Sequence, residues 1–217
     1  MKKLLLSAFV ICLAGTSIAQ ESPLWMRHCA LSPDGTTIAF TYKGDIYTVP
    51  STGGRATQIT TNPAFDTEPV WSPDSKQIAF ASDRMGSLDV FVVSSEGGAP
   101  QRLTTHSGSE KPVAYKDNKH ILFTANIAPS AEDAGFPSGQ FQQVYEVAVT
   151  GGRPAMFSSM PMECISINKE GVMLYQDKKG YEDYWRKHQV SPIARDIWTY
   201  TPGKKPVYQK QDRKSVV

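Results

Sequence analysis

The chain has 217 residues, and its 23 Lys and Arg against 21 Asp and Glu give a formal net charge of +2. Lys2 and Lys3 lie in the expected leader, so the rest of the chain is neutral, with its charges interspersed along the sequence. Nucleic-acid binding and attraction to an anionic membrane both require a basic surface patch. We therefore predict neither of these activities.

The amino terminus has the pattern of a secretory signal peptide. Lys2 and Lys3 precede an apolar run over 4–14 and small residues over 15–19, which is the order of a cleavable signal. A membrane-spanning helix needs roughly 20 apolar residues, and this run is about half as long. We expect cleavage after Ala19, a periplasmic or secreted product over 20–217, and no membrane span after cleavage.

Two cysteines, Cys29 and Cys164, remain after this cleavage. An oxidising compartment permits disulfides, so a single bridge stays open as an alternative. The two cysteines are far apart and lack CxxC spacing, so they form neither a metal site nor a disulfide framework. We expect two buried, free thiols.

An internal repeat organises residues 20–217. Its clearest copy, the second, contains Trp71-Ser-Pro-Asp-Ser75, Ile78-Ala-Phe80, Asp89-Val-Phe-Val-Val93, Gly97-Gly98 and Arg102-Leu-Thr104. The corresponding anchors of the other copies are Leu31, Ala114 and Ile167. A period of about 40 residues is typical of propellers and related arrays. In the third and fourth copies the extra length falls between the second and third expected strands.

Each copy predicts four short strands between turn signals. In the second copy the strands are expected over 68–71, 77–81, 88–94 and 100–104, where β-branched, aromatic and small apolar residues gather. Ser-Pro-Asp-Gly predicts the first hairpin, with Asp34 bonding its own backbone and Gly35 in the left-handed conformation. Paired glycines predict the hairpin between the third and fourth strands.

The strand interiors favour one architecture. Segments 78–80 and 90–93 are apolar on both faces, and such sheets are covered on both sides. We predict an all-β fold, a partial or open β-propeller of about four four-stranded blades, over approximately 24–61, 66–105, 110–158 and 162–210. A β-solenoid is the alternative, but its repeats are shorter.

The sequence offers no recognisable catalytic machinery. It lacks Gly-x-Ser-x-Gly, His-Glu-x-x-His, a Walker loop and Gly-x-Gly-x-x-Gly, so we predict no catalytic residue, no cofactor and no metal. The four histidines, His28, His106, His120 and His188, are interpreted as surface or loop residues. The acidic pairs at 132–133 and 182–183 are interpreted as solvated loop residues. Asp83 and Arg84 are interpreted as an ion pair within a tight turn.

Two insertions, over 126–142 and 177–195, are the candidates for recognition. Both lie between the second and third strands, so propeller topology places them on the same face. Clustered aromatic and arginine side chains are typical of recognition surfaces. The candidate residues for contact with a peptide or another domain are Tyr184, Trp185, Arg186, His188 and Arg195. The alternative is that the aromatic side chains pack this loop onto its own blade.

The second copy also resembles a known repeat. Its Trp-Ser-Pro-Asp-x-x-x-Ile-Ala-Phe-x-Ser-Asp-Arg, Asp-Val-Phe-Val-Val and Glu-Gly-Gly-x-x-x-Arg-Leu-Thr segments over 71–104 are similar to the propeller repeat of tricorn-type proteases and of TolB. Phe136-Pro-Ser-Gly139 and Ile193-Ala-Arg-Asp-Ile-Trp198 in the longer copies resemble the amino-terminal propeller of secreted tricorn-like serine peptidases. The resemblance covers the chain after the leader.

This resemblance implies a function. In that family the propeller continues and is followed by a PDZ-like module and a peptidase domain, neither of which has a counterpart here, so we expect a fragment or a short gene product. We expect a non-catalytic propeller segment that gates or presents peptides to a peptidase domain, in cis or in trans. The alternatives are a part of a serine peptidase whose catalytic domain lies elsewhere, and a TolB-like envelope interaction protein. Uncovered blade faces also predict self-association.

Overall fold

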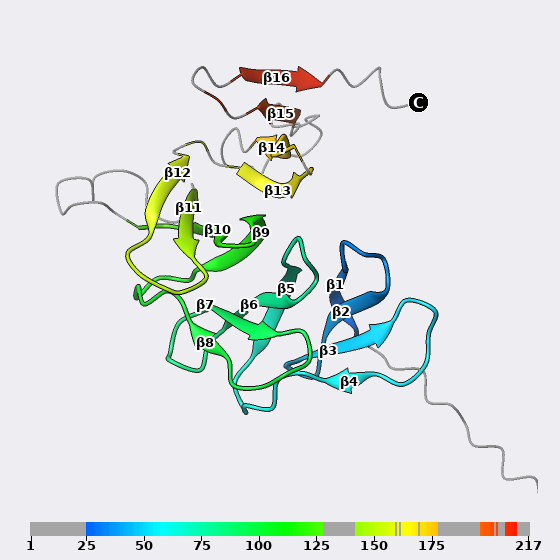
Figure 1. The fold of residues 1–217 in the computed structure, drawn as a ribbon. Coiled ribbons are helices and arrows are strands. Elements are labelled where there is room, and N and C mark those ends of the chain that lie inside the picture. The colour runs from blue at the N-terminus through cyan, green and yellow to red at the C-terminus, as the bar shows by residue number, and fades with distance from the viewer. Residues whose placement is uncertain are drawn as a thin grey trace, which may run out of the picture.

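The computed structural model describes residues 25–127, 142–158, 160, 162–168, 170–177, 196–201, 203 and 207–211. These residues form four antiparallel four-stranded sheets, which confirms the predicted propeller blades (Figure 1). Within these ranges no helix is long and apolar enough to span a bilayer.

The four blades follow one another along the chain. Blade 1 comprises β1 (Arg27–Leu31), β2 (Thr37–Tyr42), β3 (Asp45–Pro50) and β4 (Thr57–Gln58). Blade 2 comprises β5 (Asp66–Trp71), β6 (Gln77–Ser82), β7 (Asp89–Ser94) and β8 (Gln101–Arg102). Blade 3 comprises β9 (Lys111–Asp117), β10 (His120–Ala125), β11 (Gln143–Ala148) and β12 (Ala155–Ser158). Blade 4 comprises β13 (Met162–Ile167), β14 (Met173–Asp177), β15 (Ile197–Thr201) and β16 (Val207–Gln211).

The Ser-Pro-Asp-Gly turn forms as predicted. Asp34 Oδ1 accepts hydrogen bonds from the Ser32 hydroxyl at 2.6 Å and from the Thr36 backbone N–H at 2.9 Å. These bonds lower the pKa of Asp34 to about 2. Gly35 has a φ of 75°, the left-handed conformation that glycine adopts without steric cost. The polar residues of this motif therefore fix the hairpin between β1 and β2.

Each sheet has two apolar faces with different partners. We call the side chains of Ile78, Phe80, Phe91 and Val93, and their equivalents in the other blades, the front face. Their neighbours on the opposite side, such as Ala79 and Val90, form the back face. In three core clusters the front face of one blade packs on the back face of the blade before it. The core therefore lies between blades, which explains why the strands are apolar on both sides.

The blades are arranged in an arc, with the first strand of each blade on its inner side (Figure 1). Neighbouring inner strands contact one another, β1 with β5, β5 with β9, and β9 with β13. The indole N–H of Trp71 in β5 donates a hydrogen bond of 2.9 Å to the carbonyl oxygen of Ala30 in β1. This side chain links blades 1 and 2 at the inner surface.

Candidate functional site

The inner side of the arc is built from sheet edges. The inner strands β1, β5, β9 and β13 each stand at one end of their sheet order, so each has one neighbour within its blade. The outer edge of such a strand presents backbone N–H and C=O groups that can pair with another chain. Four such edges face the same side, which we call the axial surface.

Every inner strand has a bulge. The register shifts between Arg27 and Ala30, between Thr67 and Val70, and between Glu163 and Ser166. β9 shifts opposite Leu122 and Phe123. A bulge inserts an extra residue, interrupts the hydrogen-bond ladder and redirects a side chain. The axial surface is thus a set of interrupted edges.

Three bulges hold a non-glycine residue in the left-handed conformation. The φ angles are 51° for His28, 54° for Glu68 and 52° for Cys164. These residues occupy the same place before the anchors Leu31, Trp71 and Ile167. In blade 3 the register makes Tyr115, and not the sequence anchor Ala114, the equivalent of Trp71, because Ile121 pairs with Tyr115 as Ile78 pairs with Trp71. The same place is then Pro112, and a proline ring does not permit a positive φ. Such conformations cost on the order of 1–3 kcal/mol and gather at functional sites.

A charged pair bridges two neighbouring inner strands. Lys111 Nζ in β9 lies 2.7 Å from Glu68 Oε1 in β5, and both side chains are half-buried. His28 and Cys164 are exposed at the two ends of the arc. The described residues contain no group of three metal-ligating side chains. This surface therefore offers backbone donors and acceptors, two opposite charges, an imidazole and a thiol to a bound chain.

Glu68 and Lys111 were not predicted from the sequence. The signal that could have found them is their place a few residues before Trp71 and its register equivalent Tyr115, in the first strand of a blade. The aromatic and arginine content of the long loops pointed to those loops instead.

Buried carboxylates lie between the blades. Arg84 Nη2 binds both carboxylate oxygens of the fully buried Asp66, at 2.9 and 3.0 Å. At the next junction Arg102 Nη2 lies 2.9 Å from Asp89 Oδ2, beside the fully buried Glu110. Burial, reinforced by the Asp89 charge, raises the pKa of Glu110 to about 7. Asp66 and Arg84 thus pair within blade 2, as do Asp89 and Arg102, whereas Glu110 precedes β9 of blade 3 and lies beside Asp89 and Arg102 of blade 2.

Two clefts open between blades 1 and 2. One, of about 330 Å³, is lined by residues that include Asp34, Arg55 and Trp71. The other, of about 340 Å³, includes Asn62 and Arg84. Neither lining set contains a histidine.

The predicted contact residues Tyr184, Trp185, Arg186, His188 and Arg195 all lie outside the described residues. The structure describes only the residues that flank this insertion. The Asp177 N–H donates to the Asp196 carbonyl at 3.2 Å, and the Asp196 N–H donates to Asp177 Oδ1 at 2.9 Å. The two flanks of the insertion are therefore held together at the end of blade 4.

Two sequence interpretations were wrong in part. Cys29 and Cys164 are free, as expected, but both are exposed, because they lie in or beside the bulges of β1 and β13. Arg84 does not pair with its neighbour Asp83. It binds Asp66, while Asp83 Oδ1 accepts the Phe65 backbone N–H at 2.7 Å.

The histidines have separate roles. His106 Nδ1 accepts the Gly108 N–H at 3.0 Å, and His120 Nδ1 lies 3.0 Å from the Asp117 carboxylate. His28 is the bulge residue of β1, and His188 lies outside the described residues. The described histidines are thus spread over three blades.

Curated relatives share sequence with parts of this chain. Tricorn protease homolog 1 from Streptomyces coelicolor is 39% identical over 77 residues, which is 36% of this chain and 7% of that protein. The uncharacterized peptidase YuxL from Bacillus subtilis is 32% identical over 108 residues, which is 44% of this chain and 16% of that protein. This chain therefore spans less than a fifth of either protein. A putative tricorn-like protease N-terminal subunit from Sulfurisphaera tokodaii is 21% identical over 189 residues, 82% of this chain and 90% of that protein.

Solved structures share the fold. TolB from Acinetobacter baumannii superposes with a TM-score of 0.60 at 20% identity, covering 86% of this chain and 43% of TolB. The tricorn protease superposes with a TM-score of 0.59 at 14% identity, covering 85% of this chain and 22% of that protein. The family model of the tricorn protease N-terminal β-propeller domain matches residues 23–215. The chain belongs to this family of tricorn-type amino-terminal propellers.

Proposed function

We propose that this propeller segment binds extended peptides on its axial surface and gates their passage to a peptidase domain, supplied in cis or in trans. The observation that carries the proposal is the set of four sheet edges on one side, three of them bulged at the same left-handed position. Family membership supports a role beside a peptidase. The likeness to TolB, at 20% identity, extends to the fold.

The bulges favour transient contact over permanent pairing. An extended peptide can add to a sheet edge through backbone hydrogen bonds. A bulge in the middle of each short edge interrupts that ladder, so no single blade can hold a long strand of peptide. A peptide is therefore expected to make a few bonds with each blade in turn, which suits a gate.

The pair formed by Glu68 and Lys111 supplies charge recognition. A partly exposed ion pair contributes only about 0–1 kcal/mol to stability, so a peptide carboxylate or ammonium group can replace one partner at little cost. The two groups lie on adjacent blades, β5 and β9, near the middle of the arc. One site can thus receive either sign of charge.

A pair of lysine variants tests this site. Lys111→Met removes the axial cation, and Lys116→Met removes a lysine that forms a comparable ion pair, at 2.8 Å, with Glu146 of its own blade and not with a neighbouring inner strand. Fluorescence anisotropy with labelled, unstructured peptides that have free termini should show weaker binding for Lys111→Met and unchanged binding for Lys116→Met. Equal affinity for both variants and the parent chain refutes an axial peptide site. Circular dichroism verifies that both variants are folded.

The same preparation tests the non-catalytic role. We expect the purified chain to leave these peptides intact, as followed by mass spectrometry. Hydrolysis that co-purifies with the chain and persists in the Lys111→Met variant would show an activity outside the proposed site.

We also propose export through the amino-terminal leader, with cleavage after Ala19 and residence in the periplasm or outside the cell. The arrangement of Lys2, Lys3, the apolar run and the small residues supports this proposal. Expression of the full chain in a bacterial host, followed by intact mass measurement of the periplasmic fraction, should show a product that begins at Gln20. An uncleaved chain confined to the cytoplasm contradicts it.

A further inference from the structure

The cleft of about 330 Å³ lies at one end of the junction between blades 1 and 2. Its volume is close to the lower end of the range of about 300–1,000 Å³ for small-molecule sites. Blade 1 contributes Thr48 from its back face and Arg55 from the turn between β3 and β4. Blade 2 contributes Trp71 from its front face, and Ser95 and Glu96 from the turn between β7 and β8. The two blades that form the walls are held in place by the apolar core between them.

The same place at the next junction is filled by apolar side chains. Val92, which is 5% exposed, is the register equivalent of Thr48. Val149 is the equivalent of Ser95, because each donates its backbone N–H to the residue just before the second strand of its blade. The Val149 side chain packs against the core between blades 2 and 3.

At the third junction the same place holds paired charges. Glu146 is the register equivalent of Thr48, and its carboxylate lies 2.8 Å from Lys116 Nζ. Beside them His120 Nδ1 lies 3.0 Å from the Asp117 carboxylate. The first junction therefore differs from both others, since it combines hydroxyl groups with charges in an open cleft.

The polar groups of the cleft are available to a ligand. The hydroxyl groups of Thr48 and Ser95 have no hydrogen-bond partner among the described residues, and the side chains of Arg55 and Glu96 form no ion pair with them. The third charged residue of the lining, Asp34, already accepts the hydrogen bonds of its own turn. One unpaired cation on blade 1 and one unpaired carboxylate on blade 2 thus line the same cleft.

We propose that this cleft binds a small zwitterion, an amino acid or a dipeptide, with the ligand carboxylate on Arg55 and the ligand ammonium group on Glu96. Hydrogen bonds between oppositely charged groups are the strong ones in recognition, and a guanidinium group can hold a carboxylate through two parallel bonds. The hydroxyl groups of Thr48 and Ser95 supply further donors and acceptors in the same cleft. The site is separate from the axial surface and does not rest on the function proposed above.

Other small ligands match the lining less well. A sugar commonly needs an open aromatic face, but Trp71 is only 8% exposed and its indole N–H is bonded to the Ala30 carbonyl. An anion without an ammonium group would meet the carboxylates of Glu96 and Asp34 in the same cleft. A zwitterion satisfies both signs of charge at once.

The dipeptide Ala-Ala and its two blocked forms test the assignment. In a titration followed by heteronuclear NMR of the labelled protein, Ala-Ala should shift the indole N–H resonance of Trp71, which lines the cleft. N-acetyl-Ala-Ala lacks the ammonium group and Ala-Ala amide lacks the carboxylate, so each should bind about threefold to tenfold more weakly than Ala-Ala. Glucose should leave the resonance in place.

Variants then assign each end of the ligand. Arg55→Met should weaken the binding of Ala-Ala about threefold to tenfold and leave the binding of Ala-Ala amide unchanged. Glu96→Gln should likewise weaken Ala-Ala and leave N-acetyl-Ala-Ala unchanged. Arg153→Met is the matched control, because Arg153 is exposed at the place equivalent to Arg55 in the turn between β11 and β12. This control should bind like the parent chain.

Several outcomes overturn the proposal. One is a Trp71 resonance that does not move at millimolar Ala-Ala, and another is equal binding of Ala-Ala and both blocked forms. Equal loss in Arg55→Met and Arg153→Met would show attraction to surface charge in general and refute the assigned cleft. The spectra themselves verify that each variant is folded, and both substituted side chains of the cleft are exposed, so folding is expected to persist.

Discussion

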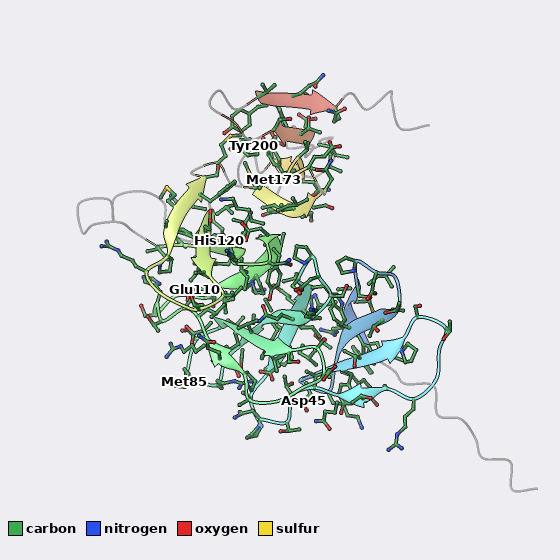
Figure 2. The ribbon with its side chains drawn as sticks, in the orientation of Figure 1. Asp45, Met85, Glu110, His120, Met173 and Tyr200 are labelled. Atoms are coloured by element: carbon green, nitrogen blue, oxygen red, sulfur yellow. The ribbon has the colours of Figure 1, made fainter. Side chains whose placement is uncertain are left out.

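Replacing Glu110 with a glutamine tests whether a buried proton stabilises the junction between blades 2 and 3. Figure 2 shows Glu110 at this junction. Its side chain is fully buried, and its backbone N–H donates a 2.7 Å hydrogen bond to the carbonyl of Leu88. Burial raises its pKa to about 7, and the nearby Asp89 carboxylate adds to the rise. The Arg102 guanidinium beside these two acids lies 2.9 Å from Asp89.

The direction and size of the effect follow from proton linkage. In the unfolded chain Glu110 releases its proton near pH 4.5, whereas in the folded protein it keeps the proton up to about pH 7. Between these values the folded state holds one more proton, so stability falls by about 1.4 kcal/mol for each pH unit. The total loss is about 3 kcal/mol and is complete above the folded pKa. A glutamine side chain at this position stays neutral at every pH, so the variant lacks this slope.

Urea denaturation at pH 5, 6, 7 and 8 measures the difference. We expect similar stability for the parent chain and Glu110→Gln at pH 5, and a variant that is more stable by up to about 3 kcal/mol at pH 8. Glu146→Gln, a change at a partly exposed carboxylate on blade 3, is the control and should follow the parent profile. A difference between parent and Glu110→Gln that does not change with pH refutes the reasoning.

Three further outcomes are expected. Arg84→Met leaves the buried Asp66 carboxylate without its partner and should lower stability by about 3–5 kcal/mol at pH 7, as measured by urea denaturation. Trp71→Phe removes the indole bond between blades 1 and 2 and should cost about 1–2 kcal/mol in the same assay. Cys29 and Cys164 should both react with a chromogenic thiol reagent in the folded protein, and a lag until denaturant is added contradicts their exposure.

The repeat architecture could be predicted from sequence because its signals are local. Asp34 and Gly35 set a hairpin with bonds that span only a few residues. The apolar runs at 78–80 and 90–93 require cover on both faces, and the neighbouring blades supply it. Strand starts were less accurate, since β5 begins at Asp66 and not at Glu68. Aspartate is typical of turns, so the sequence pattern excluded Asp66 from the strand. Its burial is possible because it pairs with Arg84, which the sequence pattern does not indicate.

The wrong interpretations of Arg84 and of the two cysteines share one cause, because both depend on how neighbouring strands pair across a sheet. Arg84 stands beside Asp83 in sequence, but Asp66 pairs with Ser82 across β5 and β6, which brings its carboxylate to Arg84. Cys164 lies in an apolar strand, but the bulge shifts the register and turns this residue to the axial surface. A one-residue shift of register moves a side chain to the other face of the sheet. The local sequence pattern does not predict where such a shift occurs.

The polar content of the blade junctions changes in order along the chain, and this order has a structural reason. The first junction contains Asp66 with its arginine, Arg84, from the turn after β6. At the second junction Ile127 occupies the position equivalent to Arg84, so no arginine stands there, and burial raises the pKa of Glu110 to about 7. At the third, Met162 replaces the acid and is buried among apolar side chains. The junctions thus pass from an ion pair, through a carboxyl group whose pKa burial raises to about 7, to apolar contact.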